Sequence, residues 1–500
     1  EKIQQSTPPI YLPNKSQFAK LNRIKGYKLS MINDPQWYSV LPPIIAIILA
    51  IKTKQVIPSL FAGIWIGCTL LYEFNPLRGL AESFEGIINV FSDSGDTKVL
   101  IFTLLIGALI NTIEKSGGVG GFVKFLENRK WVHTKIRAQL LAWVTGIVIF
   151  IESNITLLVA GSVSRPLFDR YKISREKLAY LIDATSAPVC VMVPLNAWTA
   201  VIIGLIASTG IENAFGVFVK SIPYNLYAIF AIILAFVVIL KKIDIGPMKP
   251  AEIRTSNGKL SWQENEGKEA LNAMEEKNSY SQKDAVFMIF PILTMTFAMP
   301  AGLFLTGDGN LMKGSGSTAI FWSICAALFV CWCMLLSQKR SNVNELMKLF
   351  MEGAGNLLPI AAILLMALAL GDVAKLLGTG PYVADVAGAN VPYIFLAPLV
   401  FLVSGFIAFS VGSSWGTFAI MIPIALSIAS NLDLSTSLML GAALSGGIFG
   451  DHASPISDTT VVASMAAGTD HIEHVRTQLP YALIAGFISI IGFILLSIIP

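Results

Sequence analysis

Long apolar segments constrain this chain more than any other feature. A helix needs about 20 mostly apolar residues to cross a bilayer, because the hydrocarbon core is about 30 Å thick. Segments of this kind are residues 38–53, 57–74, 98–115, 222–241, 285–306, 318–336, 356–377 and 479–499. Backbone polar groups in hydrocarbon must be satisfied within the segment, so these residues are expected to be helical. The sequence therefore predicts an all-α polytopic membrane protein.

The composition agrees with this class and argues against others. Of the 500 residues, 54% are hydrophobic and 14% are charged, whereas a soluble domain usually has about 25% charged residues. A net charge of +4, without a basic stripe or zinc-ligand spacing, gives no case for nucleic acid as a partner. The five cysteines lie in apolar runs, so neither a disulfide framework nor a metal cluster is indicated.

Two stretches fit neither one span nor two. Residues 138–169 and 392–430 each have two apolar arms around a polar tip, at 152–156 and 410–417. Each arm of the first stretch has about 13 residues, or about 20 Å of helix, which is too short to cross the core. We expect two re-entrant hairpins whose tips line a cavity enclosed by protein.

Two other segments, 176–208 and 436–464, are longer than one span. Each has prolines, or glycines and hydroxyls, where the centre of the membrane is expected. Proline removes a backbone donor and clashes with the preceding turn. We expect both to be discontinuous helices, unwound within 183–198 and around 451–457.

The sequence repeats at an offset of 261 positions. Gly117, Ser153, Thr156, Ser174 and Pro194 fall in order on Gly378, Ser414, Thr417, Ser435 and Pro455. Each half then has five spans and one re-entrant hairpin. Because five is odd, the second half starts on the opposite side of the membrane, so the repeat is inverted. Inverted repeats with discontinuous helices are typical of secondary transporters.

The repeat gives the predicted organisation of the chain. Residues 1–37 are a polar N-terminal tail, 38–241 the first inverted repeat, 242–284 a flexible linker and 285–500 the second inverted repeat. Most Lys and Arg of the short loops fall on one side, which we assign to the cytoplasm. The linker lies on that side.

Polar groups in the apolar segments predict where ions bind. Ionisable residues inside a membrane usually mark ion or proton pathways, and hard cations such as Na⁺ prefer oxygen ligands. We expect two pseudo-symmetric cation sites. The first has Glu152, Ser153, Asn154 and Thr156 with the break at Ser186, and the second has Ser413, Ser414 and Thr417 with the break at Asp451, Ser454, Ser457 and Asp458.

Only the second break has carboxylates. Asp451 and Asp458 fall opposite Cys190 and Ala197 of the first half. Burial disfavours the charged form of a carboxylate, whereas a bound cation favours it. One site can then hold either a proton or a cation, which predicts Na⁺/H⁺ exchange in the second half.

Several of these residues have a simpler alternative role. Asp451 and Asp458 would be surface groups if 436–450 were a short helix before a loop. Glu152 is either a ligand or a cap of the hairpin helix. His452 either tunes the response to pH or serves as a hydrogen-bonding partner.

Other polar and aromatic residues near the breaks also have two readings. Trp198 and Trp415, with Asn196 beside them, either line a pocket for an organic substrate or only pack. Asp372 is either a substrate or pH-tuning group or an interhelical hydrogen-bonding residue. Asp183 is expected to cap the first break, and His474 to lie at the surface.

Two motifs resemble a known family. The stretch GDHASPISDTTVVASMAAGTDHIEHVRTQLPYAL (450–483) resembles the NhaC family of Na⁺/H⁺ antiporters, and LPPIIAIILAIKTKQVIPSLFAGIWIG (41–67) resembles its N-terminal signature. The resemblance extends over 38–499. The hairpins and broken helices are similar to those of the ion transporter superfamily. That similarity implies elevator-type alternating access, cation sites at the hairpin tips and a homodimer in the cell membrane. Family members are assigned to Na⁺/H⁺, malate/lactate or amino-acid transport.

Two functions follow from these observations. The first is a Na⁺/H⁺ antiporter in which Asp451 and Asp458 exchange the two ions. The second is a Na⁺-coupled transporter of an amino acid or small carboxylate. No cofactor is expected beyond the transported ions. Glu152, Asp451 and His452 have no nucleophile–base or metalloprotease spacing, so an enzyme is not expected.

Overall fold

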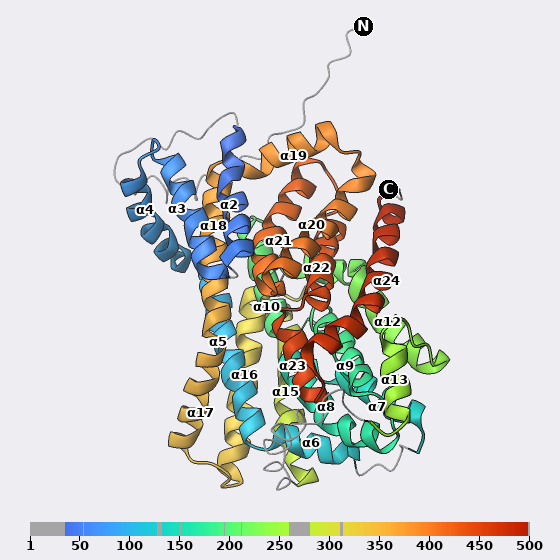
Figure 1. The fold of residues 1–500 in the computed structure, drawn as a ribbon. Coiled ribbons are helices and arrows are strands. Elements are labelled where there is room, and N and C mark those ends of the chain that lie inside the picture. Colours follow the sequence, from blue (N-terminus) through green and yellow to red (C-terminus); the bar gives the residue numbers. More distant parts are fainter. Residues whose placement is uncertain are drawn as a thin grey trace.

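The computed structural model describes residues 36–53, 55–127, 133–150, 152–194, 196–211, 213–259, 281–310 and 314–498. Nearly all of the predicted tail and the middle of the predicted linker lie outside the described residues. Within these ranges every regular element is a helix (Figure 1).

The first half of the chain forms twelve α-helices among the described residues. They are α2 (Leu41–Thr53), α3 (Val56–Leu71), α4 (Pro76–Asn89), α5 (Ser94–Lys115), α6 (Gly118–Glu127), α7 (Lys135–Val148), α8 (Ser153–Arg170), α9 (Arg175–Cys190), α10 (Ala197–Ser208), α11 (Ala214–Ser221), α12 (Leu226–Lys241) and α13 (Met248–Ser256).

The second half forms ten α-helices in the part that the structure describes. They are α15 (Val286–Thr306), α16 (Gly316–Ser337), α17 (Val343–Asn356), α18 (Leu358–Leu376), α19 (Thr379–Asn390), α20 (Leu396–Val411), α21 (Ser414–Asn431), α22 (Thr436–Ala453), α23 (Asp458–Ala467) and α24 (His471–Ile498). Short 3-10 helices are η1 (Trp37–Val40), η2 (Val90–Ser92), η3 (Ile222–Tyr224), η5 (Gln282–Ala285) and η7 (Tyr393–Phe395).

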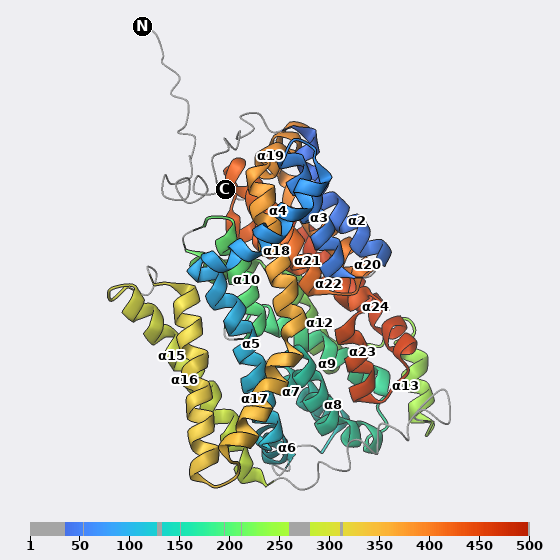
Figure 2. The same cartoon turned by 90° about the vertical axis from the view of Figure 1, so that its left-hand side faces the viewer.

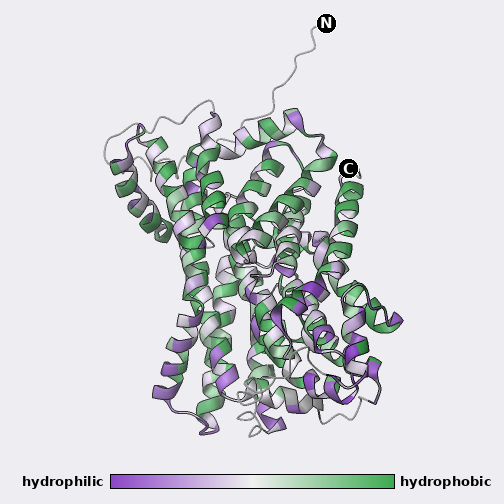
Figure 3. Ribbon diagram, viewed as in Figure 1, coloured by the Kyte–Doolittle hydropathy of each residue, from purple (hydrophilic) through white to green (hydrophobic). Residues whose placement is uncertain are grey.

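The helices have the length and surface of membrane spans. Seven in the described ranges are long and apolar enough to cross a membrane, or nine if each of two bent pairs counts as one span. Large apolar side chains face outward: Phe297 and Phe329 are 71% and 70% exposed. Figure 3 shows that hydrophobic residues cover most of the helices, while hydrophilic residues gather at the lower end of the view. The protein is therefore a multi-pass integral membrane protein.

Helix boundaries recur at the offset found in the sequence. α8 and α21 begin 261 positions apart, and each has 18 residues. α9 and α22 begin at the same offset, as do α10 and α23. In Figure 1, α7, α8 and α9 lie in the lower part of the molecule, and α20, α21 and α22 lie in the upper part.

Helices of the two halves pack between one another. α23 of the second half contacts α8 and α9 of the first, and α10 of the first half contacts α21 of the second. Figure 2 shows α15 and α16 at one edge, next to α5 and α17, with α13, α23 and α24 at the opposite edge. α8, α9 and α10 of the first half therefore meet α21 and α23 of the second half inside the molecule.

Glycines bring α20 and α22 together backbone to backbone. A Cβ added at Gly446 would overlap the carbonyl oxygen of Phe401, and one at Gly450 would overlap the carbonyl oxygen of Gly405. Small residues at this spacing let membrane helices approach closely. We call this contact the glycine seam. It ends one residue before Asp451.

The main differences from the sequence predictions concern where helices end. α7 has 14 residues and α8 has 18, whereas each arm was expected to have about 13. α8 is longer because it continues past its apolar residues to Arg170. The predicted break at Ser186 is wrong, since α9 runs through Pro188 to Cys190. Every residue of α9 is buried, so packing holds the helix across the hydrogen bond that Pro188 cannot make. The interruptions lie between Cys190 and Ala197 and between Ala453 and Asp458.

Candidate functional site

Asp451 lies in the last turn of α22 and is fully buried. Its Oδ1 accepts a hydrogen bond from Ser457 Oγ at 2.8 Å, and its Oδ2 accepts one from Thr459 Oγ1 at 3.0 Å. Ser457 is also the N-cap of α23, where its side chain accepts from the Thr460 N–H. The restart of the helix therefore brings both hydroxyls to the carboxylate. The alternative that Asp451 belongs to a surface loop is wrong.

The start of α21 places one residue beside this carboxylate. Ser414 lies beside Asp451, and its Oγ is 3.4 Å from the Gly447 carbonyl oxygen. Ser413 caps α21, and Thr417 Oγ1 donates to the Ser413 carbonyl at 3.0 Å. Ser454 Oγ donates to the Phe409 carbonyl at 2.8 Å, which ties the break to α20. Ser413, Ser454 and Thr417 are thus engaged with backbone groups around the site.

Asp458 opens α23 at an exposed position, in contrast to Asp451. Its Oδ1 accepts from the Thr459 N–H at 3.0 Å. The Asp458 carboxylate is close enough to interact electrostatically with both Asp451 and Glu152. Three carboxylates from both halves of the chain therefore share one region.

Glu152 is the N-cap of α8 and is 7% exposed. Its Oε2 accepts from the Ile155 N–H at 3.1 Å, and its Oε1 accepts from Ser153 Oγ at 3.1 Å and Asn154 Nδ2 at 3.3 Å. Thr156 Oγ1 donates to the carbonyls of Ile149 and Glu152. The capping role considered for Glu152 is therefore present in the structure.

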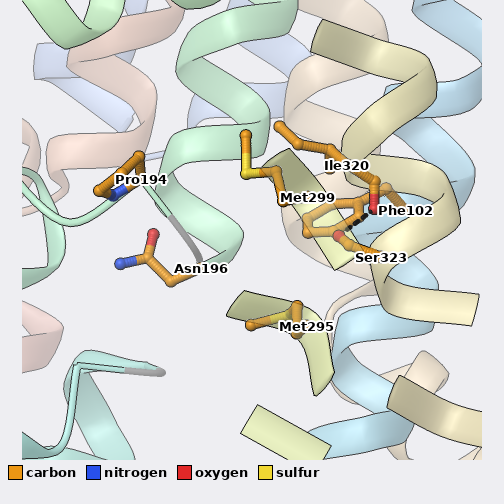
Figure 4. Close-up of a pocket in the computed structure, with 7 residues that line it drawn as sticks. All are labelled: Phe102, Pro194, Asn196, Met295, Met299, Ile320 and Ser323. Carbon is orange, nitrogen blue, oxygen red and sulfur yellow. Dashed lines mark hydrogen bonds between the residues drawn. The ribbon is translucent and has the colours of Figure 1, made fainter. Parts of the chain in front are cut away.

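The first break is filled by a neutral amide. Asn196 caps α10, and its Nδ2 donates to the carbonyls of Phe150 at 3.1 Å and Cys190 at 2.8 Å. Ser186 Oγ instead donates to the Asp183 carbonyl within α9. Figure 4 shows Pro194 and Asn196 beside a small cavity that Phe102, Met295, Met299, Ile320 and Ser323 also line. This cavity has room for about one water molecule.

Two further candidates lie apart from the carboxylates. The rings of Trp198 and Trp415 pack with their centroids 4.6 Å apart, and Phe418 lies 5.8 Å from Trp198. These rings pack α10 against α21, as one of the two readings of Trp198 and Trp415 expected. Asp372 is exposed on α18, and its charged neighbours are Lys375 and Asp93.

A buried cluster that sequence reasoning missed lies between α9, α22 and α24. Gln478 Nε2 donates to Asp183 Oδ2 at 2.6 Å, and His474 Nε2 is 3.5 Å from the same oxygen. His452 Nε2 lies 3.9 Å from Asp183 Oδ1, and its Nδ1 is 3.1 Å from the Tyr227 hydroxyl. We call these five residues the Asp183 cluster.

Two expectations about this cluster are wrong. Asp183 lies in the middle of α9 and caps nothing, and His474 is fully buried rather than at the surface. His474 and Gln478 are four residues apart and so lie on one face of α24. That spacing, with a carboxylate in the apolar sequence of α9, was the only sequence signal for the cluster.

A buried carboxylate inside a bundle of membrane-spanning helices is the arrangement of a secondary transporter, and comparisons with known proteins agree. The profile of the Na⁺/H⁺ antiporter family matches residues 189–498. An uncharacterized protein of Haemophilus influenzae is 32% identical over 484 residues, which cover 92% of this chain and 91% of that protein. This chain belongs to the Na⁺/H⁺ antiporter family.

Other relatives match shorter parts of the chain. The malate-2H(+)/Na(+)-lactate antiporter of Bacillus subtilis is 33% identical over 186 residues, which cover 33% of this chain and 37% of that protein. The arginine/ornithine antiporter ArcD of Halobacterium salinarum is 38% identical over 107 residues, or 21% of this chain and 22% of that protein. As a member of the Na⁺/H⁺ antiporter family, the chain is a transporter and not an enzyme.

Two solved transporters share the fold. The Alcanivorax borkumensis YdaH transporter has a TM-score of 0.53 and 14% identity, covering 84% of this chain and 88% of that one. Neisseria gonorrhoeae MtrF has a TM-score of 0.58 and 14% identity, covering 83% and 84%. At this identity the similarity concerns the fold alone.

Proposed function

We propose that this protein exchanges Na⁺ for H⁺ across the cell membrane, with Asp451 as the group that binds either ion. The observation that supports the proposal most strongly is the buried, hydroxyl-lined environment of the Asp451 carboxylate. It is fully buried and accepts hydrogen bonds from the neutral hydroxyls of Ser457 and Thr459. Taking a charged carboxylate out of water is costly unless a cation or a proton neutralises it.

The oxygens around Asp451 suit Na⁺, which is transported and is no resident cofactor. Ser414, Ser457 and Thr459 present hydroxyls whose oxygens are both donors and acceptors. When Na⁺ enters, their hydrogens turn away and their oxygens join the carboxylate in binding it. When Na⁺ leaves, a proton on Asp451 restores neutrality. Asp458, exposed beside this group, attracts cations to the site.

The proposal extends to the architecture. We infer that the two halves are inverted repeats, that α7–α8 and α20–α21 are re-entrant hairpins, and that the site faces each side of the membrane in turn. Helix starts that recur at 261 positions support this inference. The reciprocal contacts of α10 with α21 and of α23 with α8 support it as well. Movement of the hairpins and broken helices as one elevator-like body, in each subunit of a homodimer, completes the proposal.

The test uses the purified full chain in proteoliposomes. A Na⁺ gradient is imposed and the internal pH is followed with a dye, for wild type and for Asp451→Asn. Wild type is expected to move protons against Na⁺, and the variant to lose this by about 100-fold or more, because an amide cannot exchange a proton. Asp385→Asn, at an exposed position on α19, is the matched control. A folded wild type without Na⁺-driven proton movement would refute the proposal.

An organic substrate is the second candidate, and named relatives motivate it. One is named a malate-2H(+)/Na(+)-lactate antiporter and another an arginine/ornithine antiporter. Repeating the flux measurement with radiolabelled small carboxylates and amino acids separates the candidates. Na⁺ flux that appears only with one of these compounds would favour the second candidate.

A further inference from the structure

The Asp183 cluster contributes no ligand to the proposed Na⁺ site, yet five of its buried polar atoms make no hydrogen bond to another described residue. Asp183 and His474 are 0% exposed, and Gln478 is 1% exposed. Asp183 Oδ1, both ring nitrogens of His474, His452 Nε2 and Gln478 Oε1 have no hydrogen-bond partner among the described residues. Because unpaired polar groups are costly in a buried site, this cluster is built to take up a further species.

The chemistry of the cluster favours a proton over a metal ion. Among the residues that the structure describes, no three His, Cys, Asp or Glu side chains converge as metal ligands. The His474 Nε2 and Asp183 Oδ2 atoms are 3.5 Å apart, and both groups accept a proton.

A small cavity borders the cluster. It is lined by Tyr180, Tyr227, His452, Gln478 and Tyr481, and has room for about one water molecule. The Tyr481 hydroxyl accepts from the Ile245 N–H at 2.9 Å, in the segment between α12 and α13. The cavity therefore lies between the Asp183 cluster and the chain that leaves the end of α12.

One side chain joins the Asp183 cluster to the Na⁺ site. Gln478 Nε2 donates both to Asp183 Oδ2 and to the carbonyl of His452, at 3.0 Å. His452 directly follows Asp451 in the chain. The charge of Asp183 also acts on Asp451 and Asp458. A change of charge in the cluster therefore changes the electrostatic potential at the Na⁺ site.

We propose that the Asp183–His474 pair is a second proton-binding site, separate from Asp451, whose proton weakens Na⁺ binding. The inference rests on the proposed exchange of Na⁺ for H⁺. A proton reaches the pair by way of the cavity, whose wall includes His452 and Gln478 of the cluster, and leaves the same way. Its uptake makes the pair more positive by one charge, so Na⁺ binds less tightly nearby, and its loss restores Na⁺ binding. Other titratable groups around the pair are Tyr180 on α9, Tyr227 on α12, Asp451 and His452 on α22, Asp458 on α23 and Tyr481 on α24.

The number of protons that compete with Na⁺ tests this proposal. The Kd for Na⁺ is measured by calorimetry on the purified full chain between about pH 5.5 and 8.5. A second proton that strongly weakens Na⁺ binding brings the steepest slope of a plot of log Kd against pH towards about −2, and competition by one proton alone gives about −1. Wild type is expected to approach the first value and His474→Gln the second. A glutamine keeps polar atoms at this position but takes up no proton.

Controls separate this inference from the proposed function. His133→Gln, at an exposed histidine, is expected to keep the wild-type slope. If His474→Gln does not fold, Asp183→Asn changes the other member of the pair and is expected to give the same slope as His474→Gln. Intact Na⁺/H⁺ exchange with an unchanged slope in the variants would overturn this inference alone. If wild type shows no Na⁺/H⁺ exchange but the variants still have the shallower slope, the proposed function alone would be overturned.

Discussion

The two interrupted helices of this protein share an outline and differ in charge. Asn196 caps the restart of the first and Ser457 caps the restart of the second, 261 positions later. The Asn196 amide satisfies the carbonyls of Phe150 and Cys190, whereas the Ser457 hydroxyl donates to the Asp451 carboxylate. One break is closed by neutral hydrogen bonds and the other contains an ionisable carboxylate. The same local structure is thus closed by hydrogen bonds in one half and forms a candidate ion site in the other.

The largest effect is expected from placing a charge in the neutral break. Cys190→Asp puts a carboxylate opposite the position of Asp451, at a fully buried residue. No hydroxyl like that of Ser457 is available there, because Asn196 occupies the cap. We expect the free energy of unfolding to fall by about 3–5 kcal/mol, the cost of a buried charge without a partner. Thermal unfolding in detergent measures this, with Cys190→Ser as the control. Equal stability of the two variants would show that the breaks are interchangeable.

The two caps provide a sharper comparison. Asn196→Ala and Ser457→Ala each remove an N-cap, which is worth about 1 kcal/mol of stability, and Asn196→Ala also removes two hydrogen bonds to buried carbonyls. Only Ser457→Ala also removes a donor to Asp451, so it alone is expected to weaken Na⁺ binding, by about 10-fold. Unfolding curves and Na⁺ titrations of both variants test this. A similar loss of Na⁺ affinity in Asn196→Ala would contradict the asymmetry.

A smaller effect is expected from the second hydroxyl on Asp451. Thr459→Val removes the donor to Oδ2 and keeps the shape of the side chain. The affinity for Na⁺ is expected to fall by about fivefold, in line with one hydrogen bond or ligand of about 1 kcal/mol. Thr199→Val is the control, because the Thr199 hydroxyl donates to the Val193 carbonyl at the first break. The prediction is wrong if both valine variants bind Na⁺ equally.

The smallest effect is expected at Asp458. This residue is exposed, so water and salt screen its charge. Asp458→Asn is expected to weaken Na⁺ binding by about twofold at low ionic strength, and by less at high ionic strength. Titrations at two concentrations of choline chloride check the salt dependence. If Asp458→Asn lowered the affinity for Na⁺ as much as Asp451→Asn does, Asp458 would be a direct Na⁺ ligand and this prediction would be wrong.

Much of the fold could be predicted because hydropathy is a local property. The segments 98–115 and 318–336 became α5 and α16 almost as expected. α4 and α17 were missed as helices, since each mixes polar and apolar residues and neither fits a span. The first break was misplaced because Pro188 looks like a helix breaker in sequence, whereas packing around a fully buried α9 decides its course.

The same distinction between local sequence and helix packing applies to the candidate site. Asp451 could be found from the sequence because a carboxylate in an apolar run is conspicuous by itself. The Asp183 cluster could not, since Asp183 and Gln478 are 295 positions apart and meet only through the packing of α9 on α24. Which polar residues meet is a property of the packed helices, and a single sequence contains no direct record of it.

The glycine seam between α20 and α22 limits how this protein can be engineered. Gly405, Gly446 and Gly450 leave no room for even one added methyl group, and the seam ends beside Asp451. A library that randomises residues around the carboxylate to select a new ion preference should therefore leave these three codons fixed. A side chain at Gly446 or Gly450 would overlap the α20 backbone, and one at Gly405 would crowd the Phe449 ring. Inactive clones would then report lost packing rather than altered selectivity.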